Sequence, residues 1–205
     1  MNILVRNGLT VETDGLMQST GYEFSVAAPS HSDIDAYRDF LLFLLNYVSL
    51  GGKIEAGETV RYGFWLTKAV AMASEKITFW ELDPETMEFV PGIRNAIRFW
   101  VDQNRLCAKH SAEFVPPYLE QNVVISVGVY EGGDVQGVRY PSPEHMSGWW
   151  ITTDLYNGDT KTLQKVHAYH LVQQRPELIQ FLGLPYGYRF YSDNGEVKLD
   201  PKAQR

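Results

Sequence analysis

The sequence predicts an α+β protein of two compact halves, each with antiparallel strands packed against one or two helices. Both halves contain short segments in which apolar and polar residues alternate, which is typical of half-buried strands. In the first half these segments follow a helix–strand–strand–helix order with hairpin turns, the usual order of an α+β unit. The tandem prolines Pro116 and Pro117 block both a helix and a central strand. We therefore expect two domains, residues 1–111 and 112–205.

The first half reads as two helices around a group of strands. The helix after residue 33 has acids at Asp33 and Asp35, near its positive end, and stops at the glycine pair that follows Leu50. Its apolar side chains fall on one broad face, so it should be central to the core. The expected elements are strand 22–27, helix 33–50, strand 60–67, strand 76–82, strand 87–90 and helix 93–109.

The second half opens with the strongest strand signal of the chain, Asn122 to Val129. A turn at residues 131–134 predicts that the next strand pairs back on it as a hairpin. Pro176 suits the first turn of a short helix, and Asp193-Asn194-Gly195 suits a hairpin turn. The expected elements after 122–129 are strand 135–140, strand 149–153, a helix from residue 159 or 160 to 174, helix 176–181, and paired strands 186–191 and 196–199.

Charge and cysteine content limit the partners and the cellular compartment that we expect for the protein. The chain has 205 residues and a net charge of −7, divided as −4 over residues 1–111 and −3 over the rest, with no basic stripe. Nucleic acid and anionic membranes are therefore unlikely partners. Cys107 is the single cysteine, which rules out an internal disulfide and fits a reducing compartment. No signal peptide or membrane span is apparent, so we expect a cytoplasmic protein.

Catalytic patterns are weak throughout. Cys107 and His110 are three residues apart on an expected helix, but no third orienting residue accompanies them. Asp154 and Asp159 flank a turn and could act as paired carboxylates or bind calcium, but turn formation with helix capping explains Asn157, Gly158 and Asp159 without chemistry. We therefore expect no catalytic residues and no cofactor.

A metal site is the alternative. His167 and His170 lie three apart on an expected helix and could share an ion with His145, His110 or Asp154. That arrangement would make the protein a small metal-dependent or histidine-based hydrolase. Buried histidines with hydrogen-bonded rings explain the same pattern.

The segment Gly148-Trp149-Trp150 favours a contact surface. Adjacent residues of a strand point to opposite faces, so one tryptophan enters the core and the other meets a second layer, a groove or solvent. Exposed tryptophan is enriched at binding hot spots. We expect a partner-binding region formed by Arg139, Tyr140, Trp149, Trp150 and Asp154, although the sequence leaves open whether both tryptophans are core residues.

From Gln121 onward the chain resembles a known family. The residues that carry the resemblance are the Val-Val-Ile-Ser-Val strand, the Gly132-Gly133 turn, Ser147-Gly-Trp-Trp, Arg175-Pro-Glu-Leu and Leu184-Pro-Tyr-Gly-Tyr-Arg-Phe. This order resembles the immunity protein 33 family, also described as domain of unknown function 2185. The first half more faintly resembles suppressor-of-fused-like domains, through Gly21-Tyr-Glu-Phe-Ser-Val, the 41–50 helix and Gly57-Glu-Thr-Val.

The resemblance implies a non-enzymatic bacterial immunity protein that neutralises a cognate toxin of a polymorphic toxin system by direct binding. Neither family brings catalytic residues with it. A hydrolase and a regulatory ligand-binding domain remain the alternatives. The identity of the toxin, the oligomeric state and the relative orientation of the halves do not follow from the sequence.

Overall fold

The computed structural model describes residues 2–73 and 75–204. The chain separates into two compact units, Met1–Val101 and Asp102–Arg205, and the division falls inside helix α3 (Arg94–Lys109). The predicted α+β class is confirmed, because each unit combines one sheet with helices. The domain limits at residues 111 and 112 stay a prediction.

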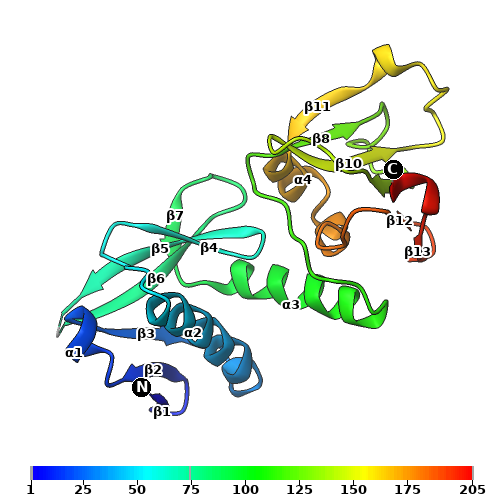
Figure 1. The fold of residues 1–205 in the computed structure, drawn as a ribbon. Helices are drawn as coiled ribbons and strands as arrows, with labels where there is room; N and C mark the ends of the chain where they lie inside the picture. Colours follow the sequence, from blue (N-terminus) through cyan, green and yellow to red (C-terminus); the bar gives the residue numbers. More distant parts are fainter. Residues whose placement is uncertain (1, 74, 205) are drawn as a thin grey trace. The chain divides into compact units, whose positions relative to one another are not determined.

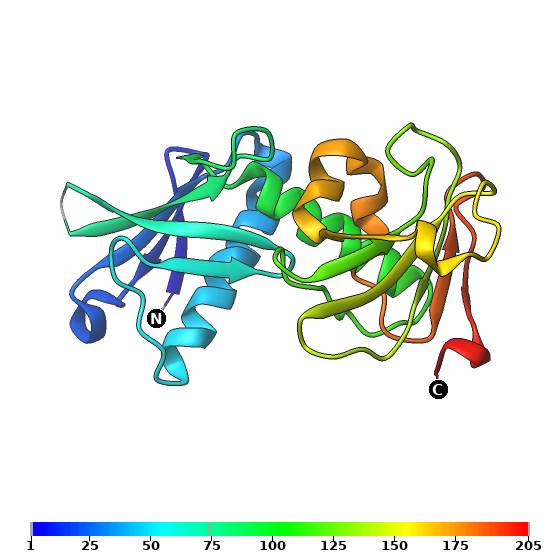
Figure 2. The same cartoon turned by 90° about the horizontal axis from the view of Figure 1, so that it is seen from above.

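The N-terminal unit is built on one mixed sheet with the strand order β1-β2-β3-β6-β5-β4, and β7 also pairs with β6. Helix α2 (Ile34–Ser49) contacts β1, β2 and β3 and runs along one side of this sheet (Figures 1 and 2). The strands are β1 (Asn2–Arg6), β2 (Thr10–Asp14), β3 (Glu23–Ala27), β4 (Thr59–Tyr62), β5 (Trp65–Met72), β6 (Lys76–Leu82) and β7 (Phe89–Pro91), with a short helix α1 (Met17–Thr20) and the 3-10 turn η1 (His31–Asp33).

Aromatic rings fill the core between α2 and the sheet. Phe40 lies edge-on to Tyr62 at 5.0 Å and to Phe79 at 5.2 Å between ring centroids, and Phe79 meets Phe24 in the same way at 5.5 Å. Trp100 of α3 stacks on Tyr62 at 4.3 Å. This packing confirms that the apolar face of the 33–50 helix is central to the first half.

The C-terminal unit has a six-stranded sheet in the order β11-β8-β10-β9-β12-β13. Helix α4 lies on one side of the sheet (Figure 1). The elements are β8 (Asn122–Ile125), β9 (Gln136–Arg139), β10 (Met146–Thr152), η2 (Thr160–Thr162), β11 (Gln164–His167), α4 (Ala168–Gln174), η3 (Pro176–Phe181), β12 (Tyr188–Tyr191), β13 (Val197–Leu199) and η4 (Pro201–Gln204).

The structure corrects two expectations for this unit. Strand β9 does not pair with β8 as a hairpin, because β10 lies between them, parallel to β8 and antiparallel to β9. The expected helix from residue 159 or 160 to 174 begins only at Ala168, since residues 164–167 form strand β11 against β8. The hairpin of β12 and β13 is confirmed.

Candidate functional site

The register of the sheet determines which face each of the two tryptophans occupies. Trp149 pairs with Arg139 across β10 and β9, and Trp150 pairs with Val138. Paired residues share a face and neighbours in sequence alternate. Arg139 and Trp149 therefore occupy one face of the sheet, while Tyr140 and Trp150 belong to the other.

Trp149 is a core residue. Its side chain is completely buried, its ring lies 5.4 Å from that of Phe190, and its Nε1 donates a hydrogen bond to the carbonyl of Leu182 at 3.2 Å. A buried indole N–H needs such a partner. One tryptophan of the pair is thus part of the core, as the alternation along a strand predicts.

Arg139 is buried as well, with 2% of its surface exposed. Its Nε donates to the carbonyl of Ser147 at 2.9 Å, and its Nη1 donates to the carbonyls of Leu184, at 2.5 Å, and Val115. The ring of Tyr186 lies 4.8 Å from the guanidinium carbon. Burial lowers the pKa of Arg139 to about 10. The guanidinium thus joins β9 to three other stretches of the unit through their backbone carbonyls.

These two placements correct the expected contact region. Arg139 and Trp149 are held inside the C-terminal unit, so neither is accessible to a partner at its surface. Sequence reasoning placed them beside Tyr140 and Trp150 correctly but could not decide which of the four side chains point inward.

Gly148 explains why the Ser-Gly-Trp element requires glycine. Its φ is +84°, a left-handed conformation, and a Cβ there would lie 2.2 Å from the carbonyl oxygen of Tyr140. The backbones of β9 and β10 therefore approach more closely than any side chain allows.

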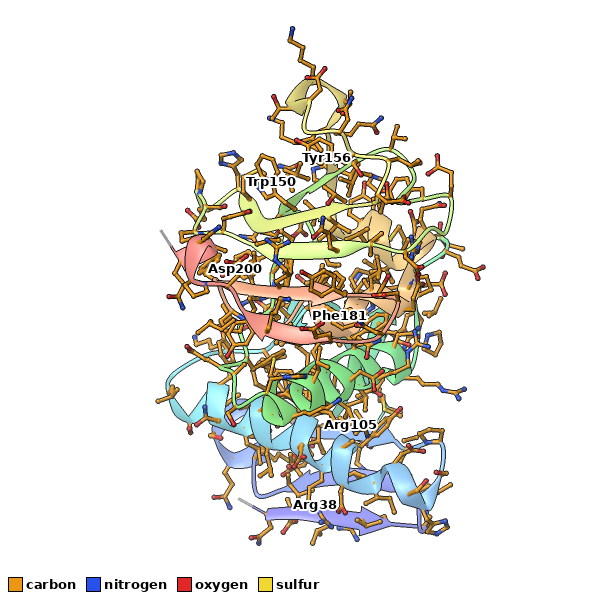
Figure 3. The ribbon with its side chains drawn as sticks, turned by 90° about the vertical axis from the view of Figure 1, so that its right-hand side faces the viewer. Arg38, Arg105, Trp150, Tyr156, Phe181 and Asp200 are labelled. Atoms are coloured by element: carbon orange, nitrogen blue, oxygen red, sulfur yellow. The ribbon has the colours of Figure 1, made fainter. Side chains whose placement is uncertain are left out.

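The other face carries two of the remaining expected contact residues, Tyr140 and Trp150; Trp150 is labelled in Figure 3. Tyr140 and Trp150 are half-buried, and their rings meet edge to face at 6.1 Å. Asp154 is exposed just beyond the end of β10. The opposite face carries Trp149, which contacts Leu182 at the end of η3, and η3 contacts α4. Partner binding by Tyr140, Trp150 and Asp154 stays a prediction.

Of the histidines considered as metal ligands, the structure brings His167 and His170 together. The rings of His167 and His170 stack at 6.1 Å, with Tyr169 4.1 Å from His170. His145 is exposed before β10, and its carbonyl accepts a hydrogen bond from the backbone N–H of Asn122. Over residues 2–73 and 75–204, no group of three or more His, Cys, Asp or Glu side chains could hold a metal ion.

The other residues considered for catalysis are explained by their structural surroundings. Cys107 is buried, and burial raises the pKa of its thiol to about 11, the opposite of what an attacking thiolate needs. Burial lowers the pKa of His110. The Asp159 carboxylate accepts a hydrogen bond from the N–H of Lys161 at 3.0 Å and caps η2, which confirms the capping interpretation of this acid.

A comparison with family models identifies the C-terminal unit. Residues 102–199 match the Imm33-like domain, which confirms the resemblance expected for the second half. No curated protein and no solved structure matches the chain. The suppressor-of-fused-like resemblance of the first half stays a prediction. No helix in the described part of the chain is long and apolar enough to cross a membrane.

Proposed function

We propose that the protein is a non-enzymatic immunity protein that binds and neutralises a cognate bacterial toxin in the cytoplasm. The observation that carries the proposal is the match of residues 102–199 to the Imm33-like domain. Neutralisation by binding needs no chemistry from the antidote. An interface of roughly 800 Å² on each partner, with a few aromatic anchors, is sufficient.

The face of the C-terminal sheet opposite α4 supplies the contact surface in this proposal. Tyr140 and Trp150 present half-buried rings there, and such rings combine apolar area with polar atoms. Val124 and Val138 pair with Trp150 on the neighbouring strands and are 5% and 6% exposed. Asp154 extends this surface at the end of β10.

The test is protection from a toxin. The polypeptide encoded by the gene beside this one is expressed in bacterial cells with and without the protein. We expect growth arrest without it and growth with it, together with a purified complex of the two. Growth arrest that is equal in both cases, with no complex formed, would refute an immunity function.

A matched pair of variants tests the surface. Trp150→Ala should weaken the complex at least tenfold, a loss typical of a hot-spot aromatic. The control is Tyr47→Ala, which removes an aromatic ring that is 47% exposed on α2 of the N-terminal unit and should leave binding unchanged. Equal affinity of both variants would place the toxin contact away from this sheet face.

A further inference from the structure

One end of the C-terminal sheet collects loops that are distant in sequence. Strands β8 and β10 run parallel, with Ile125 beside Ile151, so the segments that follow both strands begin at the same end of the sheet. Strand β9 starts there, because Gln136 pairs with Thr152, and β12 ends there, because Tyr191 pairs with Gln136. The three loops at this end span residues 126–135, 153–163 and 192–196.

Specific contacts hold these loops against one another. Thr153 donates its Oγ1 hydrogen to the carbonyl of Val127 at 2.7 Å, and its N–H donates to Ser126 Oγ at 3.1 Å. The N–H of Val135 donates to Ser192 Oγ at 2.8 Å. From beneath, the buried Arg175 donates to the carbonyl of Val129. The three loops therefore form one continuous surface.

Two apolar side chains are exposed on this surface. Val127 is 56% exposed and Leu155 is 65% exposed. They belong to loop segments in contact, since a Cβ on Gly128 would lie 3.1 Å from Leu155 Cδ1. An apolar side chain held in the open by a fixed loop gains stability only when a partner covers it.

Carboxylates are present in the same three loops as this apolar pair. Lys161 is the one cationic residue in these loops. Each loop contains two exposed acids, which together are Glu131, Asp134, Asp154, Asp159, Asp193 and Glu196. Glu196 pairs with Lys198 at 3.4 Å, whereas the other five form no ion pair within residues 2–73 and 75–204. Acids without an ion pair, in the same loops as exposed apolar side chains, are the two ingredients of an electrostatically steered protein interface.

We propose that this loop surface docks a cationic protein surface, with Val127 and Leu155 against an apolar side chain of the partner and the carboxylates facing its lysines and arginines. The inference rests on the proposed function and deepens it, because it assigns the toxin a basic, apolar-centred contact region next to the Tyr140 and Trp150 face.

The test follows backbone amide signals by NMR while a synthetic peptide is added to the full chain. The probe has lysines and arginines on both sides of a central Leu-Trp, and its counterpart carries glutamates in their place. We expect saturable shifts in the three loops with the basic peptide only, weakening as salt is raised to about 0.5 M. Shifts scattered over the surface, or equal shifts with the acidic peptide, would overturn the proposal.

Matched variants separate specific docking from general charge attraction. Asp134→Asn/Asp154→Asn/Asp193→Asn removes one carboxylate from each loop, and Glu113→Gln/Glu120→Gln/Glu144→Gln removes three exposed carboxylates of the same unit outside the loops. The loop variant should bind the basic peptide about tenfold more weakly, and the control should bind as the wild type does. Equal losses in both would overturn the assignment.

The apolar part has its own control. Leu155→Ser should reduce peptide binding several-fold, while Leu199→Ser, at a 50% exposed position on β13, should not. The growth-protection assay is independent of the peptide measurements. Protection without docking at the loops would defeat this inference alone, and docking without protection would defeat the toxin assignment.

Discussion

At the scale of single residues, the buried guanidinium of Arg139 is the most demanding group of the C-terminal unit. Its charge is compensated by backbone carbonyls and aromatic faces instead of a carboxylate. A buried cation is tolerated only when its hydrogen bonds are satisfied. This explains why arginine, with a fixed fork of donors, stands at this position.

Replacing Arg139 should therefore cost much of the unit's stability. Arg139→Met keeps most of the side-chain volume but leaves the carbonyls of Ser147 and Leu184 without their donor, so we expect a loss of about 3 kcal/mol in the free energy of unfolding. Denaturant titration measures it. Arg105→Met, at a side chain that is 77% exposed, should change stability by less than about 0.5 kcal/mol; similar losses would show that the carbonyl contacts contribute little.

Gly148 gives a second residue-scale prediction. Gly148→Ala should lower the free energy of unfolding by more than about 3 kcal/mol, because a backbone clash is added to the left-handed strain. Gly132→Ala is the control for strain alone, since φ is +87° there and nothing lies within 4 Å of the added Cβ. It should cost about 1 kcal/mol. Thermal unfolding of both variants measures the difference. Equal losses of unfolding free energy would show that the clash is not the cause.

At the scale of elements, a strand residue caps a helix in the N-terminal unit. Glu81 of β6 is 4% exposed. Its Oε2 accepts a hydrogen bond from the N–H of Ala96 at 2.7 Å, in the first turn of α3. Burial raises the pKa of this carboxyl above its ordinary value of 4.5, against the lowering effect of its hydrogen bonds to Asn95 and Ala96. The folded chain therefore holds this proton more tightly than the unfolded chain.

A pH prediction follows for Glu81. Because the folded form binds more protons, the stability contributed by this group falls as pH rises above 4.5 toward and through the raised pKa. Glu81→Gln imitates the protonated acid, so its free energy of unfolding relative to the wild type should increase from pH 4 to about pH 7. Urea titrations at several pH values measure the difference. A constant difference would show that Glu81 titrates normally.

Elements defined by local patterns could be predicted from the sequence, and those defined by distant pairing could not. Helix α2 and strand β6 fall where periodicity placed them. The β8–β10 parallel pair was missed because a turn signal at residues 131–134 indicates a hairpin, whereas the partner of β8 lies beyond β9. Residues 164–167 were predicted as part of the following helix. A strand of only four residues shows too little alternation of apolar and polar side chains to be distinguished from the helical pattern next to it.

The candidate site was predictable to the same degree. The alternation of Trp149 and Trp150 followed from strand geometry, but their orientation required the position of η3 and of Leu182, to which Trp149 donates. The apolar pair Val127 and Leu155 lies in irregular loops, where no periodic signal marks exposure. Only the register of β8, β9 and β10 brings those loops together.

At the scale of the whole molecule, the surface is acidic, with a net charge of −7 and a sequence pI near 5.2. Solubility should therefore be lowest near that pH, because charge repulsion between molecules vanishes there. Light scattering across a pH series measures it. The variant Asp134→Asn/Asp154→Asn/Asp193→Asn removes three negative charges and should move the minimum upward, and an unmoved minimum would show that these carboxylates are already neutralised.

The opposite orientations of two neighbouring tryptophans also bear on how such a protein diversifies. Along β10, Trp149 and Ile151 belong to the core, while Trp150 between them is half-buried on the other face. A substitution at Trp150 should therefore disturb the core less than the same substitution at Trp149. One strand can thereby keep its core contacts constant while the ring on its other face changes the surface of the unit.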